Sequence, residues 1–287
     1  MKEIHVPDAP ILPNGEKDSL FSYNYYKKTY LENIDFTDER LVRTPPQVFF
    51  NRIETYITKL IPQIPDSIIN GSVDLIDRSL KNKEMSKWLI FWITNHYETS
   101  PFIGMDAVFV ALVDKYYSNK EVSYWVDDAL RYKITERANT LRGTLLGVKP
   151  FNLNLPDSNM KYQSLFGVKA QYTLLIFWDP HCGHCQEELP KLNDLYSELN
   201  KTPLKTERKL EVYAMGSTTD YAAWREYIRK NKLPWINVHD PNHESDYHRH
   251  FDINTTPVIY LLNRDKKIVA KRLSVEQVKD FIEKGLD

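Results

Sequence analysis

Apolar residues in the first half of the chain recur at the spacing of amphipathic helices. Between residues 20 and 145 they return every third or fourth position, with prolines at the breaks. Pro45 and Pro46 suit the start of the first helix, and Pro62 its end. We predict helices near residues 49–61, 68–80, 85–92, 105–116 and 122–141. No fixed repeat period is visible, and we interpret the aromatic residues in these stripes as core packing rather than as a ligand groove.

The pattern changes after Gly143, Gly147 and Pro150, where short β-rich runs begin to alternate with helices. A last helix should begin at Ser274, which has capping-box spacing to Gln277. The order predicts a βαβ unit with a parallel sheet, followed by a β-hairpin and a helix. We predict strands at 172–178, 210–216, 258–263 and 267–273, and helices at 182–200 and 220–231.

Together the two patterns predict an α+β protein of two domains. We expect an extended segment at 1–19, an all-α helical domain at 20–145 and an α/β domain at 146–287. The length of 287 residues fits this division, because hydrophobic cores tend to split into domains of about 100–150 residues.

Composition and charge exclude several classes of protein. The chain has 42% apolar and 27% charged residues, as expected of a globular protein. Its 38 Lys and Arg against 39 Asp and Glu leave a net charge of -1, which disfavours nucleic acid and acidic membranes as partners. The longest apolar run, 174–178, is far shorter than the roughly 18 residues of a transmembrane helix. The first twenty residues lack the apolar core of an export signal, which fits a mature envelope protein and a cytoplasmic one equally.

Candidate chemistry is concentrated in the only two cysteines, Cys182 and Cys185. They follow an apolar strand and open a helix, where unpaired N–H groups and the helix dipole lower the pKa of a thiol. Cys182 should therefore be the thiolate, and Cys185, one turn along, the thiol that resolves a mixed disulfide. His184 between them favours the ionised, reduced form and makes the disulfide more oxidising.

A metal site is the competing interpretation. His181, Cys182, His184 and Cys185 offer four ligands, but residues so close within one turn do not readily surround a tetrahedral ion. We therefore expect redox chemistry, with neither a metal nor a cofactor. A second group of histidines is interpreted as solvated surface, with metal ligation as the alternative. That group comprises His239, His243, His248 and His250.

Three other positions bear on the thiols. Glu188 lies one turn beyond Cys185, where an acid is either a surface charge or a proton relay. Pro190 stands inside the same predicted helix and should kink it. Thr256-Pro257 precedes a strand, suits a cis peptide bond packed against the thiols, and exposes a backbone that an extended substrate segment can pair with.

With these residues in place, the chain from about 147 to 287 resembles the thioredoxin-like domains of the bacterial TlpA/ResA group of thiol:disulfide oxidoreductases. The likeness rests on Phe177-Trp178, Cys182-Gly183-His184-Cys185, Glu188 with Pro190, Thr256-Pro257, and the hairpin 263–268. It implies that Cys182 attacks, Cys185 resolves, Glu188 tunes the pair and Pro257 is a cis-proline. Trp178, His184, Thr256 and Pro257 are the expected substrate-binding residues.

The resemblance also implies partners and a location. The substrates would be protein thiols and disulfides, served by an upstream redox partner, in the periplasm or anchored to the cell envelope. The helical half is similar to extensions carried by some envelope members. His181 stands where the group commonly has Trp, Gly183-His184 resembles protein disulfide isomerases, and Ile176 replaces the buried Asp of thioredoxins. The redox direction therefore stays open. The alternative function is a protein whose helical half binds a partner and whose thiols are sensory or vestigial.

Overall fold

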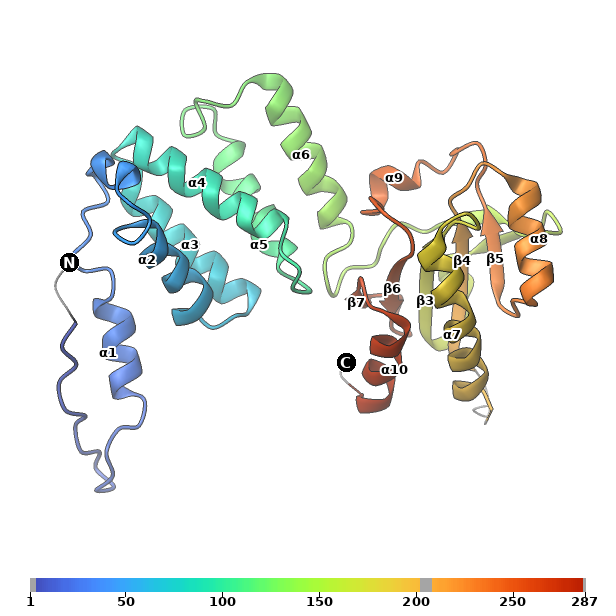
Figure 1. Ribbon diagram of the computed structural model, residues 1–287, viewed down its shortest axis with the longest axis horizontal. Helices are drawn as coiled ribbons and strands as arrows, with labels where there is room; N and C mark the ends of the chain where they lie inside the picture. The colour runs from blue at the N-terminus through green and yellow to red at the C-terminus, as the bar shows by residue number, and fades with distance from the viewer. Residues whose placement is uncertain (1–3, 202–207, 286–287) are drawn as a thin grey trace. The chain divides into compact units, whose positions relative to one another are not determined.

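A computed structural model describes residues 4–201 and 208–285, and its elements are labelled in Figure 1. The chain divides into two compact units, Met1–Thr135 and Glu136–Asp287. The predicted fold class, a helical region followed by a thioredoxin-like α/β domain, is confirmed. This division lies inside the helix Asp128–Arg142 and does not test the predicted domain boundary at 145. That boundary and the extended segment at 1–19 stay predictions. Across the described ranges, no helix combines the length and apolarity needed to cross a membrane.

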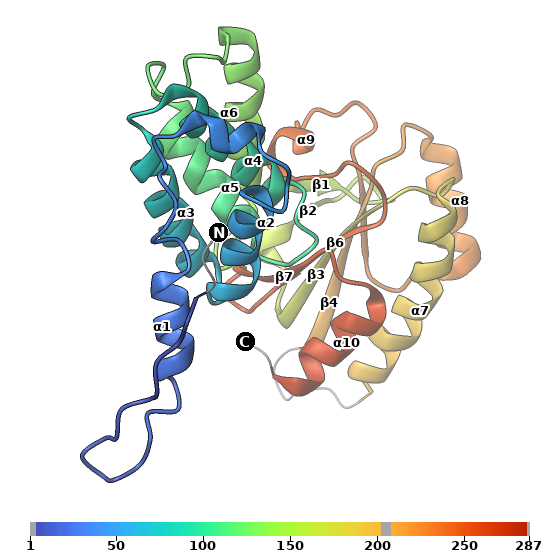
Figure 2. The same ribbon diagram turned by 60° about the vertical axis from the view of Figure 1, so that its left-hand side comes forward.

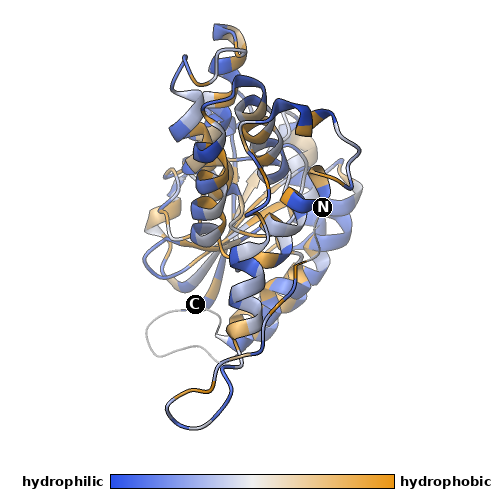
Figure 3. Cartoon of the chain, turned by 90° about the vertical axis from the view of Figure 1, so that its left-hand side faces the viewer, coloured by the Kyte–Doolittle hydropathy of each residue, from blue (hydrophilic) through white to orange (hydrophobic). Residues whose placement is uncertain are grey.

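The first unit is built of helices, of which α2 to α5 lie at predicted places, whereas α1 and η1 lie outside the predicted ranges. The apolar stripes face inward, with Ile53, Leu75, Leu89 and Phe109 almost completely buried. Figure 3 shows hydrophilic and hydrophobic residues on the same helices, as this arrangement requires. The α-helices are α1 (Phe21–Thr29), α2 (Phe50–Thr55), α3 (Pro65–Ser79), α4 (Lys83–Glu98) and α5 (Asp106–Leu112), joined by the 3-10 helix η1 (Glu39–Arg43) and the π-helices η2 (Tyr56–Leu60) and η3 (Val113–Tyr117).

The fifth predicted helix begins later than the periodicity indicated. Helix α6 runs over Asp128–Arg142, rather than from residue 122. The side chain of Asp127 accepts a hydrogen bond from the N–H of Leu130 at 2.7 Å, as an N-cap does. The Arg131 guanidinium also donates to the carbonyl oxygens of Ser123 and Val126, which holds the preceding segment in turns.

The second unit contains a five-stranded sheet in the order β5-β4-β3-β6-β7. Strands β3 (Ala170–Trp178), β4 (Arg208–Gly216) and β5 (Ile236–His239) pair in parallel. Strand β6 (Val258–Leu262) is antiparallel to its neighbours β3 and β7 (Ile268–Lys271). The long helices are α7 (Gly183–Leu199), α8 (Tyr221–Asn231) and α10 (Val275–Lys284), with short α9 (Tyr247–His250) and η4 (Leu165–Gly167). A separate hairpin pairs β1 (Asn154–Pro156) with β2 (Tyr162–Ser164).

The continuous apolar run of β3 is explained by its place at the centre of the sheet. Leu174, Ile176 and Trp178 belong to one core cluster, which includes residues of α7 and α10. Leu175 and Phe177 belong to a second cluster on the opposite face. A strand covered on both faces needs no polar alternation. Figure 2 shows α7 and α10 side by side in front of the strands.

The predicted elements of this unit are confirmed except at their ends. The capping box is present, since Ser274 Oγ accepts from Gln277 N and Gln277 Oε1 accepts from Ser274 N. Helix α7 continues through Pro190. Strand β5 and the β1–β2 hairpin were missed, because each is at most four residues long and lacks an apolar run.

Candidate active site

Both cysteines lie at the junction of β3 and α7, which is the arrangement that thiol exchange requires. Cys182 is the N-cap of α7, and its Sγ accepts a hydrogen bond from the backbone N of Cys185 at 3.4 Å. Both thiols are free. Cys185 is completely buried, whereas Cys182 is partly exposed. A partner molecule can therefore reach Cys182 first.

The turn before the helix is held by local hydrogen bonds. The backbone N of Cys182 donates to the carbonyl oxygen of Asp179 at 3.1 Å, and the N of His181 donates to Asp179 Oδ1 at 2.7 Å. Gln186 Nε2 closes the turn from the helix side by donating to the Pro180 carbonyl at 2.8 Å. These contacts fix the position of Cys182 at the start of α7.

Burial and hydrogen bonding separate the acidities of the two thiols. For Cys182, burial is the largest influence and opposes ionisation. Hydrogen bonds with the side chains of Thr256 and Cys185 and with the backbone of Cys185 and His184 together lower its pKa. For Cys185, burial is again the largest influence, and it raises the pKa to about 12. At neutral pH Cys182 is the more readily ionised sulfur, as the sequence predicted.

Thr256 and Pro257 lie against the thiols, as expected. Their peptide bond is cis. The Cys182 thiol donates to the Thr256 carbonyl oxygen at 3.1 Å, across 74 positions of sequence. Both residues are half-buried, so part of their surface faces solvent beside Cys182.

The histidines of the motif point outward. The His184 side chain is 84% exposed, with Nδ1 3.9 Å from Glu187 Oε2. His181 Nε2 lies 3.6 Å from Asp220 Oδ2, and a backbone hydrogen bond from Ala223 is the main cause of the lowered pKa of Asp220. His184 is therefore accessible to a partner that approaches Cys182.

Trp178 does not take the place predicted for a substrate-binding residue. Its side chain is fully buried in the core cluster that contains Cys185, with its ring 5.1 Å from that of Tyr227. A side chain without exposed surface cannot contact a substrate in this structure. Trp178 is therefore reassigned from substrate binding to the packed core beneath the thiols.

Glu188 is held by two contacts. Its Oε1 accepts from Lys191 Nζ at 2.8 Å, and its Oε2 accepts from the backbone N of Val275 at 3.1 Å. The carboxylate therefore connects α7 to the first turn of α10, where the helix dipole favours an anion. Its expected role as a proton relay stays a prediction.

Tyr227 is a neighbour of the site that the sequence did not reveal. Burial is the main cause of its raised pKa, and the charge of Cys185 adds to it. Tyr227 lies on α8, about forty positions beyond the motif, so only the packing of α8 on the sheet brings it there. An aromatic residue on an amphipathic helix carries no signal for such a position.

The histidine-rich segment does not converge on a metal site. Among residues 4–201 and 208–285, no group of three or more His, Cys, Asp or Glu side chains is arranged to hold a metal ion. His239 is buried, stacked on Trp224, with Nε2 2.7 Å from the Thr218 carbonyl oxygen. His250 stacks instead on Phe151 at 3.8 Å.

Comparison with known proteins agrees with this geometry. Residues 170–268 match a family described as thioredoxin-like, and residues 4–142 match a domain of unknown function (DUF5106). The chain thus carries a thioredoxin-like domain after a helical region, and its likeness to the ResA type of thiol-disulfide oxidoreductase is confirmed.

Particular relatives are distant in sequence. The sporulation thiol-disulfide oxidoreductase A of Bacillus subtilis is 29% identical over 120 residues, 40% of this chain and 68% of the relative. The thiol-disulfide oxidoreductase ResA of Bacillus cereus is 24% identical over 138 residues, 48% of this chain and 75% of the relative. A crystal structure of a thioredoxin-like protein from Bacteroides caccae matches with a TM-score of 0.70 and 19% identity, covering 98% of this chain and 99% of that one. This last match concerns the fold alone.

Proposed function

We propose that this protein is a thiol:disulfide oxidoreductase that exchanges disulfides with protein substrates through Cys182-Gly183-His184-Cys185. The observation that carries the proposal is the asymmetry of the two thiols. Cys182 is accessible and its pKa is lowered, whereas Cys185 is buried beside it and its pKa is raised to about 12. One sulfur is therefore suited to attack and the other to resolve.

In the reducing direction, the Cys182 thiolate attacks one sulfur of a substrate disulfide. A Cys182–substrate disulfide forms, and the other substrate sulfur leaves as a thiolate that takes up a proton. Cys185 then loses its proton and attacks Cys182 Sγ, which forms the Cys182–Cys185 disulfide and releases the second substrate thiolate. The substrate gains two electrons and the cysteine pair loses two. The oxidising direction reverses these steps, and an upstream dithiol or disulfide partner restores the starting state.

Substrate contacts would come from the exposed surface around Cys182. The half-buried Thr256 and Pro257 offer backbone next to the sulfur, on which an extended segment can pair. The exposed His184 imidazole flanks the same side of the helix start. We propose that this activity takes place in the periplasm or at the cell envelope, a location that the resemblance to the TlpA/ResA group supports.

Glu188 is proposed to serve the second step. It lies one turn beyond Cys185, and Lys191 and Val275 hold its carboxylate in place. A fixed carboxylate is a suitable acceptor for the proton that Cys185 must lose, given the raised pKa of that thiol.

Trapping tests the proposal. The Cys185→Ser variant should accumulate mixed disulfides through Cys182, visible on a non-reducing gel and reversed by dithiothreitol. The Cys182→Ser variant should form none and should lose turnover of an insulin-type disulfide substrate. Turnover retained by Cys182→Ser would exclude the mechanism. Titration of the wild-type pair against glutathione would then give its potential and with it the preferred direction.

A further inference from the structure

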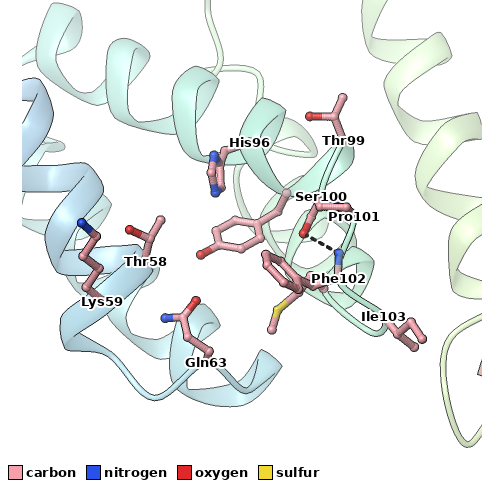
Figure 4. Close-up of a pocket in the computed structure, with 11 residues that line it drawn as sticks. Thr58, Lys59, Gln63, His96, Thr99, Ser100, Pro101, Phe102 and Ile103 are labelled. Carbon is pink, nitrogen blue, oxygen red and sulfur yellow. Dashed lines mark hydrogen bonds between the residues drawn. The ribbon is translucent and has the colours of Figure 1, made fainter.

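The helical unit contains a pocket of ≈ 720 Å³ that has no part in the thiol chemistry described above. It lies between the π-helix η2, the end of α4 and the loop that leads to α5 (Figure 4). This size is typical of sites that enclose small molecules, which span roughly 300–1,000 Å³. Single-turn π-helices are frequent at functional sites. The side chains that give the pocket its chemistry are Lys59, Gln63, His96, Tyr97, Phe102 and Ile103.

The hydroxyl of Tyr97 is the feature of this pocket that calls for a ligand. Tyr97 is 3% exposed, and its Oη has no hydrogen-bond partner among the residues that the structure describes. Burial strongly raises the pKa of Tyr97, so the group stays a neutral O–H donor. A buried donor without an acceptor is costly and rare in folded proteins. An acceptor on a bound molecule would satisfy it.

The other polar groups define what such a molecule offers. Gln63 Nε2 donates to the carbonyl oxygens of Ile57 at 2.9 Å and Ile61 at 2.8 Å, which leaves Oε1 on the pocket side (Figure 4). Burial is the largest influence on His96 and lowers its pKa, whereas the charge of the nearby Glu54 raises the pKa by a smaller amount. The imidazole is therefore neutral at pH 7.

The charge of the pocket favours an anion. Lys59 contributes an exposed ammonium group, and the described residues that line the pocket include no Asp or Glu. The remaining lining is largely apolar. Phe102 is 71% exposed and Ile103 43% exposed, so both present apolar surface at the pocket. An apolar body would cover them.

We infer that this pocket binds a small monocarboxylate with an aromatic or aliphatic body. The body packs against Phe102 and Ile103, which removes their surface from water. The carboxylate accepts the Tyr97 hydroxyl, and the Lys59 ammonium attracts it from the rim of the pocket. No side chain of the pocket reacts with the ligand.

The binding test compares an acid with its neutral counterpart on the full-length protein. 4-Phenylbutyrate and 4-phenylbutan-1-ol share one body and differ in the head group. Calorimetric titration should show saturable binding of the acid at a single site, and weaker binding of the alcohol. Fluorescence provides a second measurement, because the Trp92 ring stacks on His96 with centroids 5.5 Å apart.

Three variants locate the site, and a fourth is the control. Tyr97→Phe should weaken binding of both compounds about fivefold to tenfold, the worth of one hydrogen bond. Phe102→Ala should weaken both as well. Lys59→Met should weaken the acid alone, by at most about fivefold, because exposed ion pairs contribute little. Phe91→Ala removes an exposed ring on the same helix that does not line the pocket, and it should change neither affinity.

Stability separates a binding role of Tyr97 from a structural one. Since its hydroxyl has no partner within the described chain, the free Tyr97→Phe protein should unfold at the same or a higher urea concentration than the wild type. The inference is overturned if neither compound binds saturably, or if Tyr97→Phe binds as the wild type does. It is also overturned if the alcohol binds as tightly as the acid, or if a capped Phe-Leu dipeptide binds and the acid does not.

Discussion

Asp252 offers a measurable test of how the thioredoxin-like unit is held together. Its carboxylate is only 3% exposed, and it pairs with the guanidinium groups of Arg137 on α6 and Arg272 after β7. Asn254 Nδ2 donates to it at 2.8 Å. The substitution Asp252→Asn keeps the size of the side chain and removes its charge, so two guanidinium groups lose their counter-ion.

The structure sets the size of the expected loss. Removing one partner of a buried ion pair costs about 3–5 kcal/mol. Because the Arg272 side chain is 43% exposed and can turn to water, we expect the lower end, about 3 kcal/mol of the free energy of unfolding. Asp280→Asn is the matched control, since its partner Lys284 and the carboxylate are both well exposed, and it should cost less than about 0.5 kcal/mol.

The pH dependence of the loss has a defined sign. Burial is the largest influence on Asp252 and opposes ionisation, but hydrogen bonds and charges from the two arginines lower its pKa in the folded state. A lowered folded pKa contributes stability above the unfolded value of about 3.9, and that contribution is lost as the pH falls below it. The difference between wild type and Asp252→Asn should therefore shrink as the pH falls below about 4.

Alkylation of Cys185 provides an assay specific to this unit. In a Cys182→Ser background, Cys185 is the only thiol of the chain, and it is completely buried in the folded state. At pH 7, pulses of iodoacetamide along a urea gradient then report the unfolding of its surroundings. At pH 3 too little thiolate is present for iodoacetamide, so pulses of 4,4′-dithiodipyridine, which acid activates, take its place. If Asp252→Asn shifts the midpoint no more than Asp280→Asn does, or if the shift is the same at pH 3 and pH 7, the ion pairs do not stabilise the unit as argued.

Two further predictions concern the thiols themselves. At about pH 7, iodoacetamide should modify Cys182 and spare Cys185, because the pKa of Cys182 is lowered and that of Cys185 is raised to about 12. The rate of Cys182 modification should begin to fall only at a pH below the ordinary thiol pKa near about 8.5. Equal labelling of both cysteines by mass spectrometry would contradict this order. Glu188→Gln keeps an acceptor for the Val275 N–H, so it should cost under about 1 kcal/mol of the free energy of unfolding. It should nevertheless slow the resolution of a Cys182 mixed disulfide, because the proton acceptor is lost. Stopped-flow rates of resolution equal to those of the wild type would leave Glu188 as a link between helices only.

The parts of the fold that the sequence predicted are those with long local patterns. Strand β3 carries a continuous apolar run, and α3 and α4 carry recurring apolar stripes, so these elements were found with ends up to six residues off. Strand β5 has only four residues and contains Asn237, whose buried amide donates to the Trp235 carbonyl. Its strand conformation comes from pairing with β4, which no local pattern records.

The same distinction applies to the site. Cys182 and Cys185 interact within one helical turn, so their spacing alone predicted the pair. Thr256 and Pro257 are far away in sequence, and their place beside the thiols was predicted from a proline at the start of a strand together with the family resemblance. Trp178 was expected to bind substrate, yet it is the last residue of a strand covered on both faces and is buried.

Tyr97 shows how far an apolar pattern can be interpreted. Tyr97 lies on α4 beyond the predicted range 85–92, and it is 3% exposed, so its ring is packed in the core. Periodicity says nothing about the hydroxyl at the end of that ring. Leaving it without an acceptor costs about 1–3 kcal/mol, which phenylalanine at the same position would avoid. In the inference drawn above this hydroxyl gains an acceptor, because the adjoining pocket is where the head group of a ligand would bind.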